Sequence, residues 1–301
     1  LSPSDADEAC TCDEITAGSL YINGTGTDPI DLSCITEVTG TLEIETTTAP
    51  SIDLSGLESV GDRVLIHDNT DLANITLTGL HTVGSSVEIQ RNDDLINVYA
   101  AGIADIGGHL KIYDNTQLGA VELDDLSSVD GYILVKDNYS LEALRVPSLE
   151  TVGDYLEIDS NGELYSVEAT SLTSVINNFL ITSNGTLATL DLDGLTTVGH
   201  TLNINNAPNL SSVSLPALLE VETNFEIRNN SGIESIDLPV LERVGSVIQF
   251  EDNTTMESTS APVLTTVGSS LIFRNNPAMS LLDLSAIACV PDFTIETHSL
   301  S

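Results

Sequence analysis

The chain has 301 residues, of which 41% are apolar and only 4% aromatic, and it contains no tryptophan. A core built mainly from Leu, Ile and Val suits a narrow interior packed in layers better than a broad globular one. With 46 acidic and 8 basic residues, the formal net charge is −38. Nucleic acid and anionic lipid are therefore poor partners, because binding would bring like charges together.

The cysteines gather at the N-terminus, where Cys10, Cys12 and Cys34 lie, and the fourth is Cys289. Their spacing matches no zinc site. In the elongated repeat structure described next, Cys289 would lie beyond disulfide reach of the other three. We expect Cys34 to pair with Cys10 or Cys12 and to staple an N-terminal cap over residues 1–34. Cys289 is expected to pair with a cysteine of another segment or molecule.

From Leu57 onward, a period of 23 residues continues without insertion or deletion. One column holds only Leu or Ile: Leu57, Leu80, Ile103, Leu126, Leu149, Leu172, Leu195, Leu218, Leu241, Leu264 and Ile287. A fixed period of this size is typical of a solenoid. We expect the solenoid over residues 35–287, in about eleven coils, followed by a truncated cap over residues 288–301. Leu20/Ile22 and Leu42/Ile44 form a degenerate unit, spaced by 22 residues.

Each unit reads L-x-x-V-G-x-x-L-x-I-x-x-N-x-x-L-x-x-V-x-L-x-x. Its two apolar pairs, such as Leu156/Ile158 and Val167/Ala169, have the period of strands, and L-x-x-V is expected to turn the corner between them. A leucine-rich-repeat horseshoe, with a helix in the second half, is the alternative. One repeat position carries proline, which would interrupt a helix: Pro147, Pro216, Pro239 and Pro262. We therefore predict an all-β fold, a parallel β-helix.

Two further columns predict how the coils are joined. Asparagine recurs in nine of ten units, at Asn69, Asn92, Asn115, Asn138, Asn161, Asn184, Asn230, Asn253 and Asn276. We expect an inward ladder of amides that satisfies backbone groups from coil to coil. Glycine recurs at Gly61, Gly84, Gly107, Gly153, Gly199, Gly245 and Gly268. A corner that needs positive φ or close backbone passage explains that column.

Seven N-x-S/T sequons occur along the chain. Those at Asn138, Asn184 and Asn253 belong to the asparagine column and are expected to be buried. The better glycosylation acceptors are Asn23, Asn74, Asn209 and Asn229. Together with the cysteines, these sequons predict an extracellular, cell-surface or cell-wall protein.

The units carrying VGxxLxIxxN, the L-x-x-V corners and the cysteine-bearing cap before Leu20-Tyr-Ile22 and Ile30-Asp-Leu32 resemble receptor L-domain-like repeats. They are most similar to the fungal GPI-anchored cell-wall organisation proteins related to the sporulation-specific wall family. The resemblance implies a right-handed β-helix displayed on the cell surface, with a role in wall integrity and a possible GPI lipid anchor. It brings no catalytic residues.

We expect no catalytic, cofactor or metal site. Coils of uniform length leave no long loops to wall a groove. The histidines fall in different columns and are interpreted as surface residues: His67, His81, His109, His200 and His298. Calcium held by acidic neighbours on successive coils is a weaker alternative, because no calcium-loop pattern supports it.

Several cations and tyrosines share one outward sheet and form a candidate recognition face: Arg91, Lys111, Tyr132, Lys136, Tyr155, Arg228 and Arg274. The simpler interpretation is an ion-pair ladder between coils, with Glu88, Glu226 and other glutamates. The leading functional hypothesis is a non-enzymatic surface glycoprotein that organises wall or matrix, or mediates adhesion, by binding cell-wall polysaccharide or a surface protein. A receptor-like ectodomain for a protein or peptide ligand is the alternative. A polysaccharide-active enzyme is less favoured.

Overall fold

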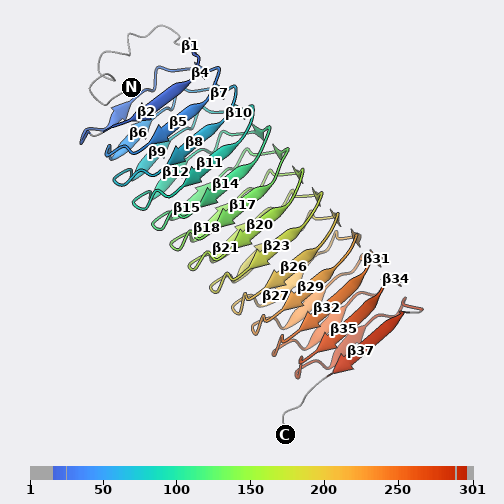
Figure 1. The fold of residues 1–301 in the computed structure, drawn as a ribbon. Helices are drawn as coiled ribbons and strands as arrows, with labels where there is room; N and C mark the ends of the chain where they lie inside the picture. Colours follow the sequence, from blue (N-terminus) through green and yellow to red (C-terminus); the bar gives the residue numbers. More distant parts are fainter. Residues whose placement is uncertain (1–15, 25, 289, 297–301) are drawn as a thin grey trace. The chain divides into compact units, whose positions relative to one another are not determined.

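The computed structural model describes residues 16–24, 26–288 and 290–296. Throughout this part of the chain the secondary structure is strand, without a helix, and no segment forms a helix that could cross a membrane. The chain divides into two compact units, residues 1–149 and residues 150–301. They are called the N-terminal unit and the C-terminal unit, and each is described by itself (Figure 1).

Each regular coil contributes three short strands, as in β10 (Thr82–Val83), β11 (Val87–Gln90) and β12 (Asn97–Tyr99). Every one of these strands pairs in parallel with the equivalent strand of the next coil, 23 residues further on. The predicted parallel β-solenoid is therefore confirmed, and the horseshoe with helices is not formed. The L-x-x-V corner differs from expectation, because its valine lies in a two-residue strand that builds a sheet of its own.

In the N-terminal unit the strands fall into three sheets. The first sheet holds β1 (Thr16–Ala17), β4 (Glu37–Val38), β7 (Ser59–Val60), β10, β13 (Asp105–Ile106) and β16 (Ser128–Val129). The second sheet holds β2 (Leu20–Asn23), β5 (Leu42–Glu45), β8 (Val64–His67), β11, β14 (Leu110–Tyr113) and β17 (Ile133–Lys136). The third sheet holds β3 (Ile30–Asp31), β6 (Ser51–Asp53), β9 (Asn74–Thr76), β12, β15 (Ala120–Glu122) and β18 (Ala143–Arg145).

The C-terminal unit repeats this arrangement. Its first sheet holds β19 (Thr151–Val152), β22 (Ser174–Val175), β25 (Thr197–Val198), β28 (Glu220–Val221), β31 (Arg243–Val244) and β34 (Thr266–Val267). Its second sheet holds β20 (Leu156–Asp159), β23 (Phe179–Thr182), β26 (Leu202–Asn205), β29 (Phe225–Arg228), β32 (Val247–Glu251), β35 (Ser270–Arg274) and β37 (Asp292–Glu296). Its third sheet is in two parts: β21 (Ser166–Glu168) with β24 (Thr189–Asp191), and β27 (Ser212–Ser214) with β30 (Ser235–Asp237), β33 (Ser258–Ser260) and β36 (Leu281–Asp283).

The core consists of the inward side chains of all three sheets. Alternate residues of the second-sheet strands are buried, as Leu110 and Ile112 are in β14, because successive side chains of a strand point to opposite faces. Phenylalanines fill this position in the C-terminal unit, and Phe225, Phe250 and Phe273 pack edge to face with ring centroids 5.3 and 5.5 Å apart. All three side chains are fully buried.

The predicted asparagine ladder is also confirmed, and all nine side chains of the column are fully buried. Amide oxygens of the column accept from the coil before them, as Asn92 Oδ1 does from the backbone N–H of Asn69 at 3.2 Å. The amide nitrogen of Asn92 donates to the Ile66 carbonyl at 3.0 Å. The side chain therefore joins coils and satisfies buried backbone groups at once.

Glycine occupies this column because the backbones of successive coils pass close to each other there, and not because the column needs positive φ. A Cβ added at Gly84 would lie 2.2 Å from the carbonyl oxygen of Gly61 on the preceding coil. Positive φ occurs instead in the residues just before the asparagine column, with φ of 51–58°: Thr46, Asp68, Arg91, Asp114, Asp137, Ser160, Ser183, Asn206, Asn229, Asp252 and Asn275. Asp and Asn dominate this column because their short polar side chains tolerate the left-handed region best after glycine.

Candidate functional site

The outward side of the second sheet carries the predicted cations, and most of them pair with acids on the same sheet. Lys111 Nζ lies 3.5 Å from Glu88, and Arg274 Nη1 lies 3.5 Å from Glu251 on the neighbouring strand. Arg228 contacts Glu226 of its own strand at 2.5 Å. The predicted ion pairs between coils are confirmed for Lys111 and Arg274, whereas Arg228 pairs within its own strand. The same side chains remain at the surface for a partner to contact.

Tyr132 is held by two neighbours in the N-terminal unit. Its ring stacks on His109 with centroids 3.9 Å apart, and the Lys111 ammonium lies 5.4 Å from the ring centroid. Contacts with Tyr132 and the nearby Glu88 raise the pKa of Lys111. These contacts hold the Tyr132 ring in place on the candidate recognition face. Of the other predicted residues, Lys136 ends β17 in the same unit, whereas Tyr155 precedes β20 in the C-terminal unit.

A cluster of carboxylates surrounds His67 on the same sheet. Glu43 and Glu45 lie two residues apart on β5 and so point outward together, and Glu45 stands opposite His67 of β8. His67 Nε2 is 3.3 Å from Glu43 Oε1 and 3.8 Å from Glu45 Oε2. His67 points outward as expected, but only 13% of its side chain is exposed, because these acids cover it.

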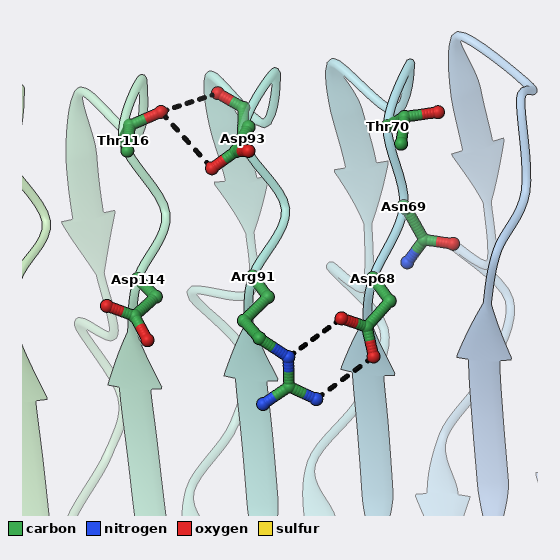
Figure 2. Close-up of a pocket in the computed structure, with 7 residues that line it drawn as sticks. All are labelled: Asp68, Asn69, Thr70, Arg91, Asp93, Asp114 and Thr116. Atoms are coloured by element: carbon green, nitrogen blue, oxygen red, sulfur yellow. Dashed lines mark hydrogen bonds and ion pairs between the residues drawn. The ribbon is translucent and has the colours of Figure 1, made fainter.

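Asp68 links this cluster to the next coil. Its carboxylate accepts from Arg91 Nε at 2.7 Å and Arg91 Nη2 at 3.0 Å (Figure 2). His67 Nδ1 approaches the same carboxylate at 2.7 Å. The hydrogen bond from Arg91, and then that from His67, holds the pKa of Asp68 well below its usual range. The Asp68 carboxylate is therefore held by two partners, the Arg91 guanidinium and the His67 imidazole.

An open pocket of about 450 Å³ lies at the corner that follows β8, β11 and β14. Figure 2 shows its lining, called the corner pocket from here on: Asp68, Asn69, Thr70, Arg91, Asp93, Asp114 and Thr116. Thr116 donates to the backbone carbonyl of Asp93 at 3.1 Å. The lining positions recur in every coil but their residue types alternate, with Arg91 between Asp68 and Asp114 in one row and Asp93 between two threonines in the next. This mixture of carboxylate, guanidinium and hydroxyl groups suits a ligand rich in hydroxyl groups.

Of these residues, the sequence had indicated only Arg91 as a recognition residue. The signal for the His67 cluster lay in the strand columns, because aligning Leu42-x-Ile44 with Val64-x-Ile66 places Glu45 beside His67. The corner pocket had a signal in the repeated acids just before and after the asparagine column, such as Asp68 and Asp93.

The predicted modification sites lie in different environments. Asn23, Asn209 and Asn229 are exposed, whereas Asn74 is half-buried and accepts a hydrogen bond from Asn97 at 2.9 Å. Asn138, Asn184 and Asn253 are fully buried, as expected. Cys10, Cys12 and Cys289 lie outside the described residues, so the pairing of Cys34 stays a prediction, and His298 also lies outside them.

Comparison with known proteins adds no relative. No protein family matches the sequence of this chain, and no characterised protein matches it either. The fold and the groups on its surface therefore carry the functional argument.

Proposed function

We propose that this chain is a non-enzymatic surface scaffold, secreted or held at the cell surface, that organises cell wall or matrix or mediates adhesion. The observation that carries the proposal is the outward side of the second sheet, where strand follows strand in register within each unit. Coils of equal length give rows of identical spacing, and such rows suit an extended, repetitive partner. The fungal wall-protein resemblance and a GPI anchor belong to the same proposal.

The partner we propose is a cell-wall polysaccharide that enters the corner pocket. Sugar hydroxyls can donate to the carboxylates of Asp93 and Asp114 and accept from the Arg91 guanidinium. A neutral polysaccharide such as glucan or chitin carries no charge that the acidic chain would repel, unlike nucleic acid. The exposed Asn23, Asn209 and Asn229 fit glycosylation of an extracellular protein, and the expected Cys34 disulfide fits the same location.

The test is binding of the purified chain to a glycan array and to insoluble glucan and chitin particles, with product release measured in parallel. We expect saturable binding to one polysaccharide class without turnover. Asp114→Asn should weaken that binding roughly tenfold, because a charged hydrogen bond to the ligand is lost.

Asp252→Asn is the matched control. Asp252 has the same repeat position and the same left-handed backbone as Asp114, with φ of 58° against 55°, but it lies in the C-terminal unit outside the corner pocket. Its substitution should leave binding unchanged. Release of sugar products would overturn the proposal in favour of an enzyme, and binding to no glycan, or equal loss in both variants, would remove the corner pocket as the site.

A further inference from the structure

The imidazole of His67 and the carboxylates of Glu43 and Glu45 are not used by the proposed polysaccharide binding, although Asp68 and Arg91 beside them line the corner pocket. Its Nε2 atom faces Glu43 Oε1 at 3.3 Å and Glu45 Oε2 at 3.8 Å. One ligand atom from each of the three residues can be chosen so that all lie within 4.8 Å of one another. Glu43 and Glu45 lie on β5 and His67 lies on β8. These are paired strands of one sheet, so the backbone pairing fixes the spacing of the three side chains.

The other side of the imidazole is fixed by Asp68. Both oxygens of Asp68 accept from Arg91, at 2.7 and 3.0 Å, so this group is a carboxylate that only accepts hydrogen bonds. His67 Nδ1, 2.7 Å from Asp68, must then carry the hydrogen. The remaining nitrogen, Nε2, turns its lone pair toward two further carboxylates, and that position requires a cation or a proton.

A histidine whose Nδ1–H is held by a carboxylate while Nε2 is free to coordinate is the arrangement found around protein-bound zinc. Here Asp68 is the outer carboxylate, and Arg91 holds Asp68 in turn. The side chains of His67 and Glu43 are only 13% and 19% exposed, while that of Glu45 is 40% exposed. The three groups are thus largely preorganised, with an open side toward solvent through Glu45.

We propose that Glu43, Glu45 and His67 bind a divalent transition-metal cation, with zinc as the best match. Imidazole nitrogen favours zinc over magnesium or calcium, which prefer all-oxygen sites. Three protein ligands leave a fourth position for water or for a donor from a partner. Asp68 is a positioning residue that orients the imidazole.

The experiment is a zinc chloride titration of the full chain by isothermal calorimetry, in about 150 mM salt and with excess magnesium to occupy the general acidic surface. We expect one zinc per chain in a saturable site. X-ray absorption of the zinc-loaded chain should show one nitrogen ligand and oxygen ligands at about 2.0–2.2 Å. His67→Leu should abolish this site, and Asp68→Asn should weaken it by roughly 10- to 100-fold.

His81→Leu is the matched control, because His81 is an exposed histidine of the same unit outside the cluster, and its substitution should leave zinc affinity unchanged. Thermal unfolding of each variant without metal separates loss of ligand from loss of fold. If His67→Leu does not fold, Glu45→Gln takes its place and should also weaken zinc binding. The proposal is overturned if no one-to-one site is found, or if a folded His67 or Glu45 variant binds zinc as the natural chain does.

Discussion

The asparagine column behaves differently in two regions of the molecule. In the N-terminal unit, Asn69, Asn92 and Asn115 form an unbroken series in which each backbone N–H donates to the amide oxygen of the next coil. In the C-terminal unit the series stops at Ala207, which is fully buried but offers no side-chain oxygen to Asn184. It resumes at Asn230, whose Oδ1 accepts from the Ala207 N–H at 2.8 Å.

The third sheet also differs between the N-terminal unit and the C-terminal unit. In the N-terminal unit β3 to β18 pair without interruption. In the C-terminal unit β24 and β27 are not paired, and an open pocket of about 310 Å³ lies between them. Leu190, an inward residue of β24, is half-exposed, whereas the equivalent Val167 of β21 is 2% exposed.

The shared position of the two interruptions indicates that the amide ladder keeps neighbouring coils together at this corner. Proline after the corner does not explain the gap, because Pro277 follows the column in the same way as Pro208 while β33 still pairs with β36. The coil that lacks the amide is the one that opens.

The largest expected effect comes from removing an amide where the ladder is intact. Asn92→Ala takes away the acceptor for Asn69 and the donor to Ile66. Leaving these buried groups unpaired should lower the free energy of unfolding by about 3 kcal/mol, measured by urea denaturation. Asn97→Ala is the control, since it removes one half-buried side-chain bond to Asn74, and it should cost under about 1 kcal/mol. Equal losses would contradict the special role of the column.

The spacing between coils can also be changed by a substitution outside the asparagine column. Gly84→Ala places a Cβ 2.2 Å from the Gly61 carbonyl oxygen, so the backbone must shift, and the free energy of unfolding should fall by about 2 kcal/mol. Gly185→Ala is the matched variant, because nothing lies within 4 Å of a Cβ there. It should be neutral or slightly stabilising. A neutral Gly84→Ala would show that the coils tolerate wider spacing than the ladder argument allows.

A smaller gain is expected from restoring the missing amide. Ala207→Asn supplies an acceptor for the backbone N–H of Asn184 and should raise the free energy of unfolding by about 1 kcal/mol. Ala207→Ser, with a shorter side chain, should gain less. Destabilisation by Ala207→Asn would mean that this coil has adapted its packing to alanine.

The smallest expected effect is the pH dependence of stability that comes from the ion pair of Asp68 with Arg91. Folding lowers the pKa of Asp68 through Arg91 and then His67, so its contribution to stability is present above the unfolded pKa and is lost as pH falls toward the folded pKa. The side chain is 43% exposed, and solvent screening keeps the contribution small. The difference in unfolding temperature between the natural chain and Asp68→Asn should therefore be largest above pH ~5 and shrink below pH ~4. A difference that grows on acidification would contradict the assigned direction.

The repeat predicted most of the scaffold, because inward columns such as Leu57, Val60 and Asn92 depend only on period and polarity. Close packing at Gly84 was also anticipated. The repeat did not predict two features: the positive φ of the residues just before the asparagine column, and the sheet formed by the L-x-x-V corner. Both depend on local backbone geometry, which a consensus of residue types does not specify.

The candidate sites were harder to predict for a different reason. The His67 cluster joins Glu43 and Glu45 of β5 to His67 of β8 in the regular strand register, but the repeat consensus leaves these outward positions unspecified. The opening beside β24 arises where a single unit departs from the consensus at Ala207. In both cases the distances between side chains follow only from the folded chain.

Amide hydrogen exchange at two buried residues tests most directly whether the asparagine column holds the coils together. The Ala169 N–H donates to the Asp191 carbonyl on the next coil at 3.0 Å, whereas the equivalent N–H of Leu192 has no such partner among the described residues. Both residues are buried, at 3% and 1% exposure. We predict that the Leu192 amide exchanges much faster than that of Ala169 and that Ala207→Asn slows it. Equal protection of the two amides in the natural chain, or no change at Leu192 in Ala207→Asn, would contradict the account.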